Sequence, residues 1–178
     1  MVKKILLTLL AGVLLLIAAV GVNTVRKGSR QLQVAPLAPV AVDEKAVAER
    51  LAEAVRLKTI SSRDDTNLSA DQFKAFHALL QARFPKTHAA LKREVVADLS
   101  LLYTWEGADP KAKPILLLAH QDVVPVAPGT EGDWKQPPFS GAVVDGYVWG
   151  RGSWDDKGNL MSELEAVEML LASGYKPP

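Results

Sequence analysis

The feature that most restricts the fold of this sequence is an uncharged apolar run close to its first residue. The eighteen residues from Ile5 to Val22 consist mainly of Leu, Ile, Val and Ala, and they follow Lys3 and Lys4. A helix needs about 17 to 25 such residues to cross a membrane. A buried core helix is the alternative, but it would lack any polar face. The run therefore predicts a membrane anchor or signal segment over residues 1–26.

The flanks of this run bear on its orientation and fate. Lys3 and Lys4 favour a cytoplasmic N-terminus, whereas Arg26 and Lys27 on the far side weaken that preference. The letters AAVGV at the end of the run form only an imperfect cleavage site, which favours a signal-anchor over a cleaved signal peptide. We expect a protein anchored in a membrane with its folded part outside the cytoplasm, periplasmic or lumenal, and secreted if the segment is cleaved.

A tether and a folded part are predicted after the run. Residues 27–42 contain Pro36 and Pro39 without helical periodicity, which is typical of an extended linker, and the folded part covers residues 43–178. The chain has 21 basic and 20 acidic residues, so its net charge of +1 gives no reason to expect nucleic acid as a partner. Because the chain has no cysteine, any metal ligands must be His, Asp or Glu.

Three amphipathic patterns predict helices in the folded part. Asp43 can cap the first helix, and Gly174 can close the last. Ser69 and Gln72 have the spacing of a capping box at the start of the second helix, which Pro85 can stop. The apolar positions of the three patterns are Val47, Leu51 and Val55; Phe73, Phe76, Leu80 and Phe84; and Leu160, Leu164, Val167 and Leu171. We expect these faces to pack in a core.

Short apolar runs predict strands between the second and third helices. They cover residues 95–96, 101–105 and 115–119, and Asp145 with Gly146 marks a hairpin turn. The run ILLLA at residues 115–119 is continuous, as in a strand that is buried on both faces. Helices that flank apolar strands predict an α/β fold.

A histidine and an acid follow the run ILLLA. If the chain stays extended there, His120 and Asp122 project to the same side. A neutral imidazole binds zinc through one nitrogen, and a carboxylate that accepts the other N–H fixes the orientation of the ring. The pattern His-x-Asp alone is a weak indication, because a histidine at the end of a strand is more often structural.

The stretch GRGSWDDKG, from Gly150 to Gly158, places two adjacent acids just before a helix. Its glycines permit backbone angles and close approaches that other residues forbid. Either acid could cap the helix, and for Asp156 this is the favoured interpretation. The carboxylate of Asp155 has two oxygens and could bridge two metal ions about 3.5 to 4 Å apart.

Together, these motifs resemble the metal-binding half of the zinc carboxypeptidase and aminoacylase family. The family includes Gly-Xaa carboxypeptidase, acetylornithine deacetylase and succinyl-diaminopimelate desuccinylase, and the resemblance is closest to the Gly-Xaa carboxypeptidase branch. It covers residues 43–178 and is most specific from Leu116 to Gly158. It implies an α/β fold, the helix-covered mixed sheet of a dinuclear zinc peptidase catalytic domain, of which residues 43–178 are the N-terminal part, preceded by the hydrophobic N-terminal helix.

The resemblance also implies a role for each residue of the two motifs. His120 binds one zinc ion, Asp155 bridges both zinc ions, and Asp122 is the catalytic acid that orients His120. Asp156 is not a ligand, and the peptide bond that joins it to Asp155 is cis. Arg151 is a surface or a supporting residue on this interpretation. The same holds for Lys157, whereas packing roles are expected for Trp134, Pro138 and Phe139.

The family completes its site with residues that do not follow here. They are a Glu-Glu pair, whose first member is the general base and whose second is a ligand, a further acid and a final histidine. Glu163, Glu165 and Glu168 are interpreted as the solvated face of the last helix. His77 and His88 match no ligand of the family. We expect the chain to be a fragment that is inactive, or nearly so, on its own.

The function expected of the complete enzyme is zinc-dependent hydrolysis of an amide bond. The substrate is a short peptide or an N-acyl amino acid with a free C-terminal carboxylate, and a homodimer of the full-length protein is compatible with the resemblance. A biosynthetic deacylase of N-acyl amino acids is one alternative, although such deacylases resemble soluble enzymes. A non-catalytic, membrane-anchored remnant of the fold is another, and it predicts no tight metal binding.

Overall fold

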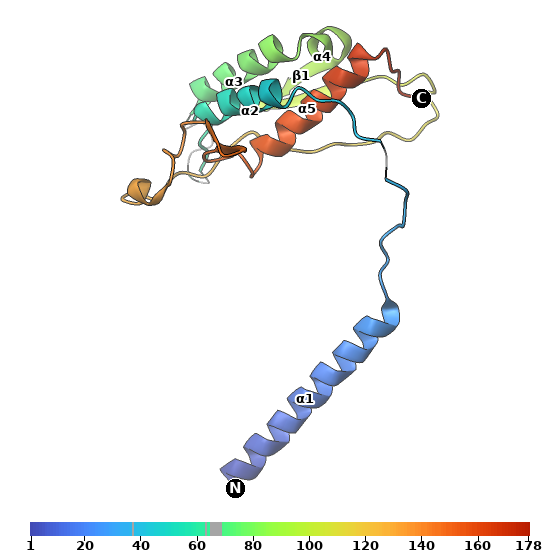
Figure 1. Cartoon of the computed structure of the whole chain (residues 1–178), viewed down its shortest axis with the longest axis vertical. Coiled ribbons are helices and arrows are strands. Elements are labelled where there is room, and N and C mark those ends of the chain that lie inside the picture. Colours follow the sequence, from blue (N-terminus) through green and yellow to red (C-terminus); the bar gives the residue numbers. More distant parts are fainter. Residues whose placement is uncertain (37, 63, 65–68) are drawn as a thin grey trace. The chain divides into compact units, whose positions relative to one another are not determined.

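A computed structural model describes residues 1–36, 38–62, 64 and 69–178 of the chain. The chain divides into two compact units, Met1–Ala41 and Val42–Pro178. The first contains the helix α1 (Val2–Lys27), drawn in blue in Figure 1, in which no residue is buried. By length and composition α1 could cross a membrane, since its most apolar window has a mean hydropathy of 2.9. A signal sequence would have the same properties.

In the residues that the structure describes, the second unit is built from four α-helices and two short antiparallel sheets. One sheet pairs β1 with β2, and the other pairs β3 with β4. The helix α2 contacts α3, α5, β3 and β4, and α4 contacts α5. In chain order, the elements are α2 (Glu44–Arg56), α3 (Ala70–Arg83), α4 (Pro85–Ala90), β1 (Lys92–Val96), β2 (Ser100–Thr104), the 3-10 turn η1 (Glu131–Asp133), β3 (Ala142–Val144), β4 (Tyr147–Trp149) and α5 (Lys157–Ala172).

The core lies where α2, α3 and α5 meet. Its buried cluster consists of Ala54, Phe76, Leu80, Phe84 and Met161, and side chains such as Leu160 and Leu164 of α5 pack against it. The apolar face predicted for the second helix is confirmed, because its three phenylalanines and Leu80 are at most 4% exposed. This burial drives the three helices together.

The helix ends agree only in part with the predicted caps. Asp43 accepts a hydrogen bond from the backbone N–H of Ala46 at 3.0 Å, so the first cap is confirmed. The prediction of a capping box at Ser69 and Gln72 is wrong. The Ser69 side chain makes no cap hydrogen bond, and the Gln72 amide oxygen accepts a hydrogen bond from the Lys58 backbone N–H at 3.1 Å. Lys58 follows α2, so Gln72 bonds to a residue of another element instead of to the start of its own helix. Pro85 does more than end α3, because it begins α4.

The acidic face of α5 is not solvated, contrary to the interpretation of its sequence. Glu165 forms a two-pronged ion pair with Arg50 of α2 and is only 12% exposed. Glu168 caps α4, where it accepts hydrogen bonds from the backbone N–H groups of Lys86 and Thr87 at 2.9 and 2.8 Å. Carboxylates are stabilised at helix N-termini, so these acids bind α5 to two other helices.

The hairpin predicted at Asp145 and Gly146 is confirmed. Both residues have positive φ angles, 53° and 79°, as the two-residue turn between β3 and β4 requires. Likewise, Gly174 closes α5 with φ 77°. These local signals suffice because each turn depends on its own backbone.

The prediction of a buried strand at residues 115–119 is wrong for this chain. The side chains from Ile115 to Leu118 are 60–89% exposed, and within the described residues no strand pairs with them. A continuous apolar run is buried only when neighbouring strands and helices cover it. The run marks a surface that the second unit leaves uncovered.

Candidate metal centre

The segment that carries His120 and Asp122 is held in place by the residues that follow α2. Val123 forms an isolated parallel bridge with Ile60. Its backbone N–H donates to the Thr59 carbonyl at 2.9 Å, and its carbonyl accepts from the Ser61 N–H at 3.2 Å. Val123 is only 3% exposed, so the segment is anchored immediately after the two candidate site residues.

His120 lies between the two other candidate residues. Its Nδ1 is 3.0 Å from a carboxylate oxygen of Asp122, and its Nε2 is 2.9 Å from a carboxylate oxygen of Asp155. The sequence separations are two and 35 residues, so the fold brings together two motifs that the sequence keeps apart. When Nδ1 carries the proton and donates to Asp122, the Nε2 lone pair faces the carboxylate of Asp155.

The charge around His120 favours its protonated form. Partial burial lowers the pKa of His120, but the hydrogen bonds to Asp155 and Asp122, with the charges of Asp122 and Asp156, raise it above its ordinary value of 6.5. An imidazolium can donate to both carboxylates at once. A bound cation would take the place of the second proton.

Asp122 has a support of its own. One oxygen contacts His120, and the other accepts a short hydrogen bond from the Ser61 hydroxyl. A carboxylate held on both sides keeps the imidazole in a fixed orientation. The sequence offered no signal for this role of Ser61, because a lone serine 61 residues away belongs to no motif.

The turn of GRGSWDDKG brings Asp155 and Asp156 to His120. A side chain at Gly152, where φ is 89°, would collide with Val123, so the turn packs directly on the His120 segment. The Asp155–Asp156 peptide bond is cis, as the resemblance implied. Asp156 precedes α5 but makes no side-chain cap, contrary to the favoured interpretation. Its carboxylate accepts from the His120 backbone N–H at 3.0 Å and so ties the two motifs together.

Lys157 and Arg151 have different surroundings. Lys157 is fully buried, and its ammonium donates to the carbonyls of Ala54 and Leu57 at 2.9 and 2.6 Å. Burial lowers the pKa of Lys157 to about 8. The Arg151 guanidinium lies 5.1 Å from the ring centroid of Trp134, a stacking distance. Lys157 is thus a buried support, and Arg151 packs on an aromatic ring.

The other two histidines lie outside the centre. His77 is 8% exposed, and its Nε2 is 3.0 Å from the side-chain oxygen of Gln121. The Gln121 amide also donates to the Leu99 carbonyl, so its side chain is held by partners on both its oxygen and its nitrogen. His88 bonds to Tyr103 at 2.9 Å. Both contacts are structural, and Gln121 is a further support that no motif indicated.

The donor set fits a zinc site in kind, but it is incomplete. Imidazole nitrogen and carboxylate oxygen are ordinary zinc ligands, and zinc prefers four of them. Within the described residues no group of three or more His, Cys, Asp or Glu side chains is arranged to hold a metal ion. His120 and Asp155 therefore supply only part of the ligand set that a zinc site needs.

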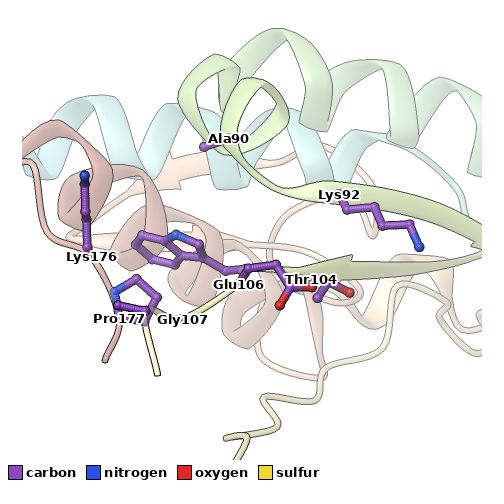
Figure 2. A pocket seen from close by; sticks show the side chains of 9 residues that line it. Ala90, Lys92, Thr104, Glu106, Gly107, Lys176 and Pro177 are labelled. Carbon is purple, nitrogen blue, oxygen red and sulfur yellow. The ribbon is translucent and has the colours of Figure 1, made fainter. Parts of the chain in front are cut away.

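Two surface cavities lie outside this constellation. One of about 410 Å³ is lined by the end of β2, Trp105 and the last residues of the chain, including Lys176 (Figure 2). The other, of about 560 Å³, is lined by residues that include Lys58, Ile60 and Phe139. Neither cavity includes His120, Asp122 or Asp155 in its lining.

Comparison with known proteins relates these motifs to a single family. The sequence profile of "Peptidase family M20/M25/M40" matches residues 116–178, which hold both motifs. The "Probable carboxypeptidase S-like 2" of Dictyostelium discoideum is 43% identical over 99% of this chain and 35% of its own length. Carboxypeptidase S of Saccharomyces cerevisiae is 48% identical over 72% of this chain and 24% of its own length.

Other relatives carry a different name. An N-fatty-acyl-amino acid synthase/hydrolase of Mus musculus is 38% identical over 94% of this chain and 33% of its own length. Among solved structures, an M20 family metallo-carboxypeptidase from Sulfolobus solfataricus matches 75% of this chain and 28% of that chain, with a TM-score of 0.52 and 24% identity. This likeness confirms the predicted α/β fold class. The chain spans about a third or less of the length of these proteins. Through residues 116–178, which hold both motifs, the chain matches peptidase family M20/M25/M40, and it is similar in sequence and fold to part of these relatives.

Proposed function

We propose that this chain provides part of the catalytic centre of a zinc-dependent hydrolase that cleaves the amide bond of short peptides or N-acyl amino acids with a free C-terminal carboxylate. One observation carries the proposal. His120 Nε2 and a carboxylate oxygen of Asp155 face each other at 2.9 Å, while Asp122 holds the opposite ring nitrogen. A ligand pair with an orienting acid is the arrangement of a zinc site.

Each residue then has a distinct task. His120 would bind zinc through Nε2, and Asp155 would be the ligand that the two ions share. Asp122 accepts the Nδ1–H of His120, which keeps the lone pair on Nε2, and Ser61 keeps Asp122 in place. The zinc pair, when bound, supplies polarisation of the scissile carbonyl and a water of lowered pKa. The remaining ligands and the general base come from residues other than those described.

The substrate class follows from what the relatives have in common. Some are named carboxypeptidases, and others are named N-fatty-acyl-amino acid synthase/hydrolases. A peptide cut before its last residue and an N-acyl amino acid share one chemical group, an amide on the nitrogen of an amino acid with a free carboxylate. This shared group supports hydrolysis at that bond, and the acyl side remains open in size.

The N-terminal unit supports a location for this activity. We propose that α1 anchors the protein in a membrane and that residues 28–42 tether a catalytic domain outside the cytoplasm. The 26 residues of α1 are about 39 Å long at 1.5 Å per residue, enough to cross a bilayer core of about 30 Å.

A chimera tests the proposed function. In it, the aligned segment of yeast carboxypeptidase S is replaced by residues 43–178 of this chain, so that the relative supplies the rest of the centre. With zinc, we expect the chimera to hydrolyse Gly-Leu or an N-acyl amino acid, and Asp155→Asn to abolish this activity. Glu49→Gln, which changes an exposed acid of α2, is the matched control and should leave activity unchanged.

The outcomes separate the alternatives. A folded chimera that hydrolyses neither substrate class would contradict the proposal and favour a non-catalytic remnant of the fold. Cleavage of N-acetylornithine without cleavage of dipeptides would favour the biosynthetic deacylase. The unmodified 178-residue chain should show no hydrolysis, because its described residues hold only part of the donor set.

A further inference from the structure

A fully buried lysine lies two residues after Asp155. The Lys157 ammonium donates to the carbonyls of Ala54 and Leu57, which belong to the last turn and the C-cap of α2. Its third neighbour is the ring of Phe76, 5.3 Å away. Carbonyls at a helix C-terminus lack partners inside the helix, so a cation there is well placed to satisfy them.

The segment that Lys157 holds also contacts the other half of the candidate centre. Directly after Leu57, the Thr59 hydroxyl donates to the Gln121 carbonyl at 2.6 Å, and the Ser61 hydroxyl donates to Asp122. Thr59 is fully buried. Residues 57–61, which we call the α2 exit segment, therefore hold the segment of His120 in place.

Lys157 fixes the turn of Asp155 to the same segment. Its backbone N–H donates to the Gly152 carbonyl at 3.0 Å, which closes the turn that contains Asp155. The Lys157 ammonium joins the turn to Leu57 of the α2 exit segment. Thr59 and Ser61 of the same segment bond to Gln121 and Asp122, the neighbours of His120 in the sequence. His120 and Asp155 come from different parts of the chain, and this segment is a common support for both.

We propose that Lys157 is a positioning residue that, through the α2 exit segment, sets the spacing between His120 and Asp155 and thereby the affinity for zinc. The inference rests on the proposed function, because it assumes that these two residues bind the metal. An apolar side chain could fill the same volume at less cost than a buried cation. The lysine adds two directed hydrogen bonds, which fix a distance that packing alone leaves adjustable.

Zinc titration of the full chain tests the proposal. The chain has only three histidines, so ¹⁵N-histidine labelling in detergent micelles gives one pair of ring-nitrogen signals for each of three rings, and those of His77 and His88 are internal references. We compare wild type with Lys157→Met, which keeps the stem and removes the donors. The matched control is Arg50→Met, which removes a different cation that joins α2 to α5. The zinc Kd is read from the shift of the His120 signal.

We expect Lys157→Met to raise the zinc Kd about tenfold or more, the usual effect of losing a residue that orients a ligand. Arg50→Met should stay within about twofold of wild type. A Kd for folded Lys157→Met within about twofold of wild type would overturn the positioning role alone. A wild-type chain whose His120 signal does not respond to zinc would also overturn the positioning proposal, whereas the activity of the chimera decides the proposed function separately.

Two further measurements keep the proposal testable if Lys157→Met does not fold. Thr59→Val removes the hydroxyl that joins the α2 exit segment to Gln121 and keeps the side-chain shape, so an unchanged Kd in this variant overturns the proposal. Lys157→Cys can be aminoethylated selectively, because the chain has no cysteine. This modification restores an ammonium at nearly the original reach, and the proposal requires that it also restore the zinc affinity.

Discussion

Replacing Glu168 by alanine should destabilise the second unit, because this carboxylate satisfies three donors at the start of α4. One oxygen accepts from the Lys86 backbone N–H, and the other accepts from both the N–H and the hydroxyl of Thr87, at 2.8 Å each. Thr87 is fully buried, so water cannot replace the lost acceptor there. Lys86 is exposed, and water can serve its N–H.

The expected loss follows from the two buried donors. A hydrogen bond to a charged group contributes about 1.5 to 3 kcal/mol, and a buried donor left without an acceptor costs a similar amount. Without Glu168, the buried Thr87 N–H keeps the full cost of a missing acceptor. The Thr87 hydroxyl can rotate toward another acceptor and so keeps only part of that cost. We therefore expect Glu168→Ala to lower the free energy of unfolding by about 3 kcal/mol. Glu168→Gln keeps an acceptor oxygen and should lose about 1 kcal/mol.

Urea unfolding of the full chain in detergent micelles measures this loss. Tryptophan fluorescence reports only on the second unit, since all four tryptophans lie between Trp105 and Trp154. With an m value of about 2 kcal/mol/M, a loss of 3 kcal/mol lowers the midpoint by about 1.5 M. Glu163→Ala is the control on the same helix and should change stability by less than about 0.5 kcal/mol. Equal midpoints for Glu168→Ala and Glu163→Ala would refute this reasoning. They would instead support the interpretation that the acids of α5 form a solvated face.

Four other substitutions test three separate parts of the structure. The folded-state pKa of His77 lies below its ordinary 6.5, mainly through burial, so the stability that neutral His77 contributes is complete above pH 6.5 and is lost as the pH falls. The urea midpoint should therefore drop less between pH 7 and pH 5 in His77→Gln than in wild type. Equal drops in the two proteins would contradict this prediction. Ile115→Lys should change the urea midpoint little, because the Ile115 side chain is 89% exposed. Phe76 is buried, so Phe76→Ala should lower the free energy of unfolding by about 3 to 5 kcal/mol. A large loss of stability in Ile115→Lys would show that residues 115–119 are covered. Ser61→Ala should weaken zinc binding about tenfold in the histidine titration with little change in the urea midpoint, and an unchanged Kd would exclude its support of Asp122.

Local signals predicted the parts of the fold that depend on neighbouring residues. The cap at Asp43, the turn at Asp145 and Gly146, and the end of α5 at Gly174 each follow from the backbone needs of a few residues. The apolar face of α3 was also predictable, because a stripe of three phenylalanines must be buried.

Tertiary partners account for what the sequence could not predict. Gln72, Asp156 and Glu168 each occupy a position with an ordinary local role, and each instead serves a donor between 14 and 82 residues away. The run ILLLA predicted a buried strand but is exposed here, because an apolar pattern does not provide the neighbours that bury it. Long-range choices of this kind leave no periodic trace in a single sequence.

The candidate centre was predictable for a different reason. His120, Asp122 and Asp155 stand in two motifs whose joint spacing resembles one family, and the structure brings the three side chains into contact. The supports Ser61 and Gln121 were not predictable, because they act through hydrogen bonds that depend on the folded positions of α2 and α3. Lys157 was expected as a surface or a supporting residue, and the structure shows the supporting position.

The measurement that tests the proposed centre most directly is anomalous diffraction at the zinc edge from crystals of the chimera grown with zinc. The proposal predicts two zinc peaks about 3.5 to 4 Å apart, one of them about 2.0 to 2.1 Å from His120 Nε2, with the Asp155 carboxylate between the two. Zinc peaks elsewhere, with none in bonding distance of His120 and Asp155, would contradict it.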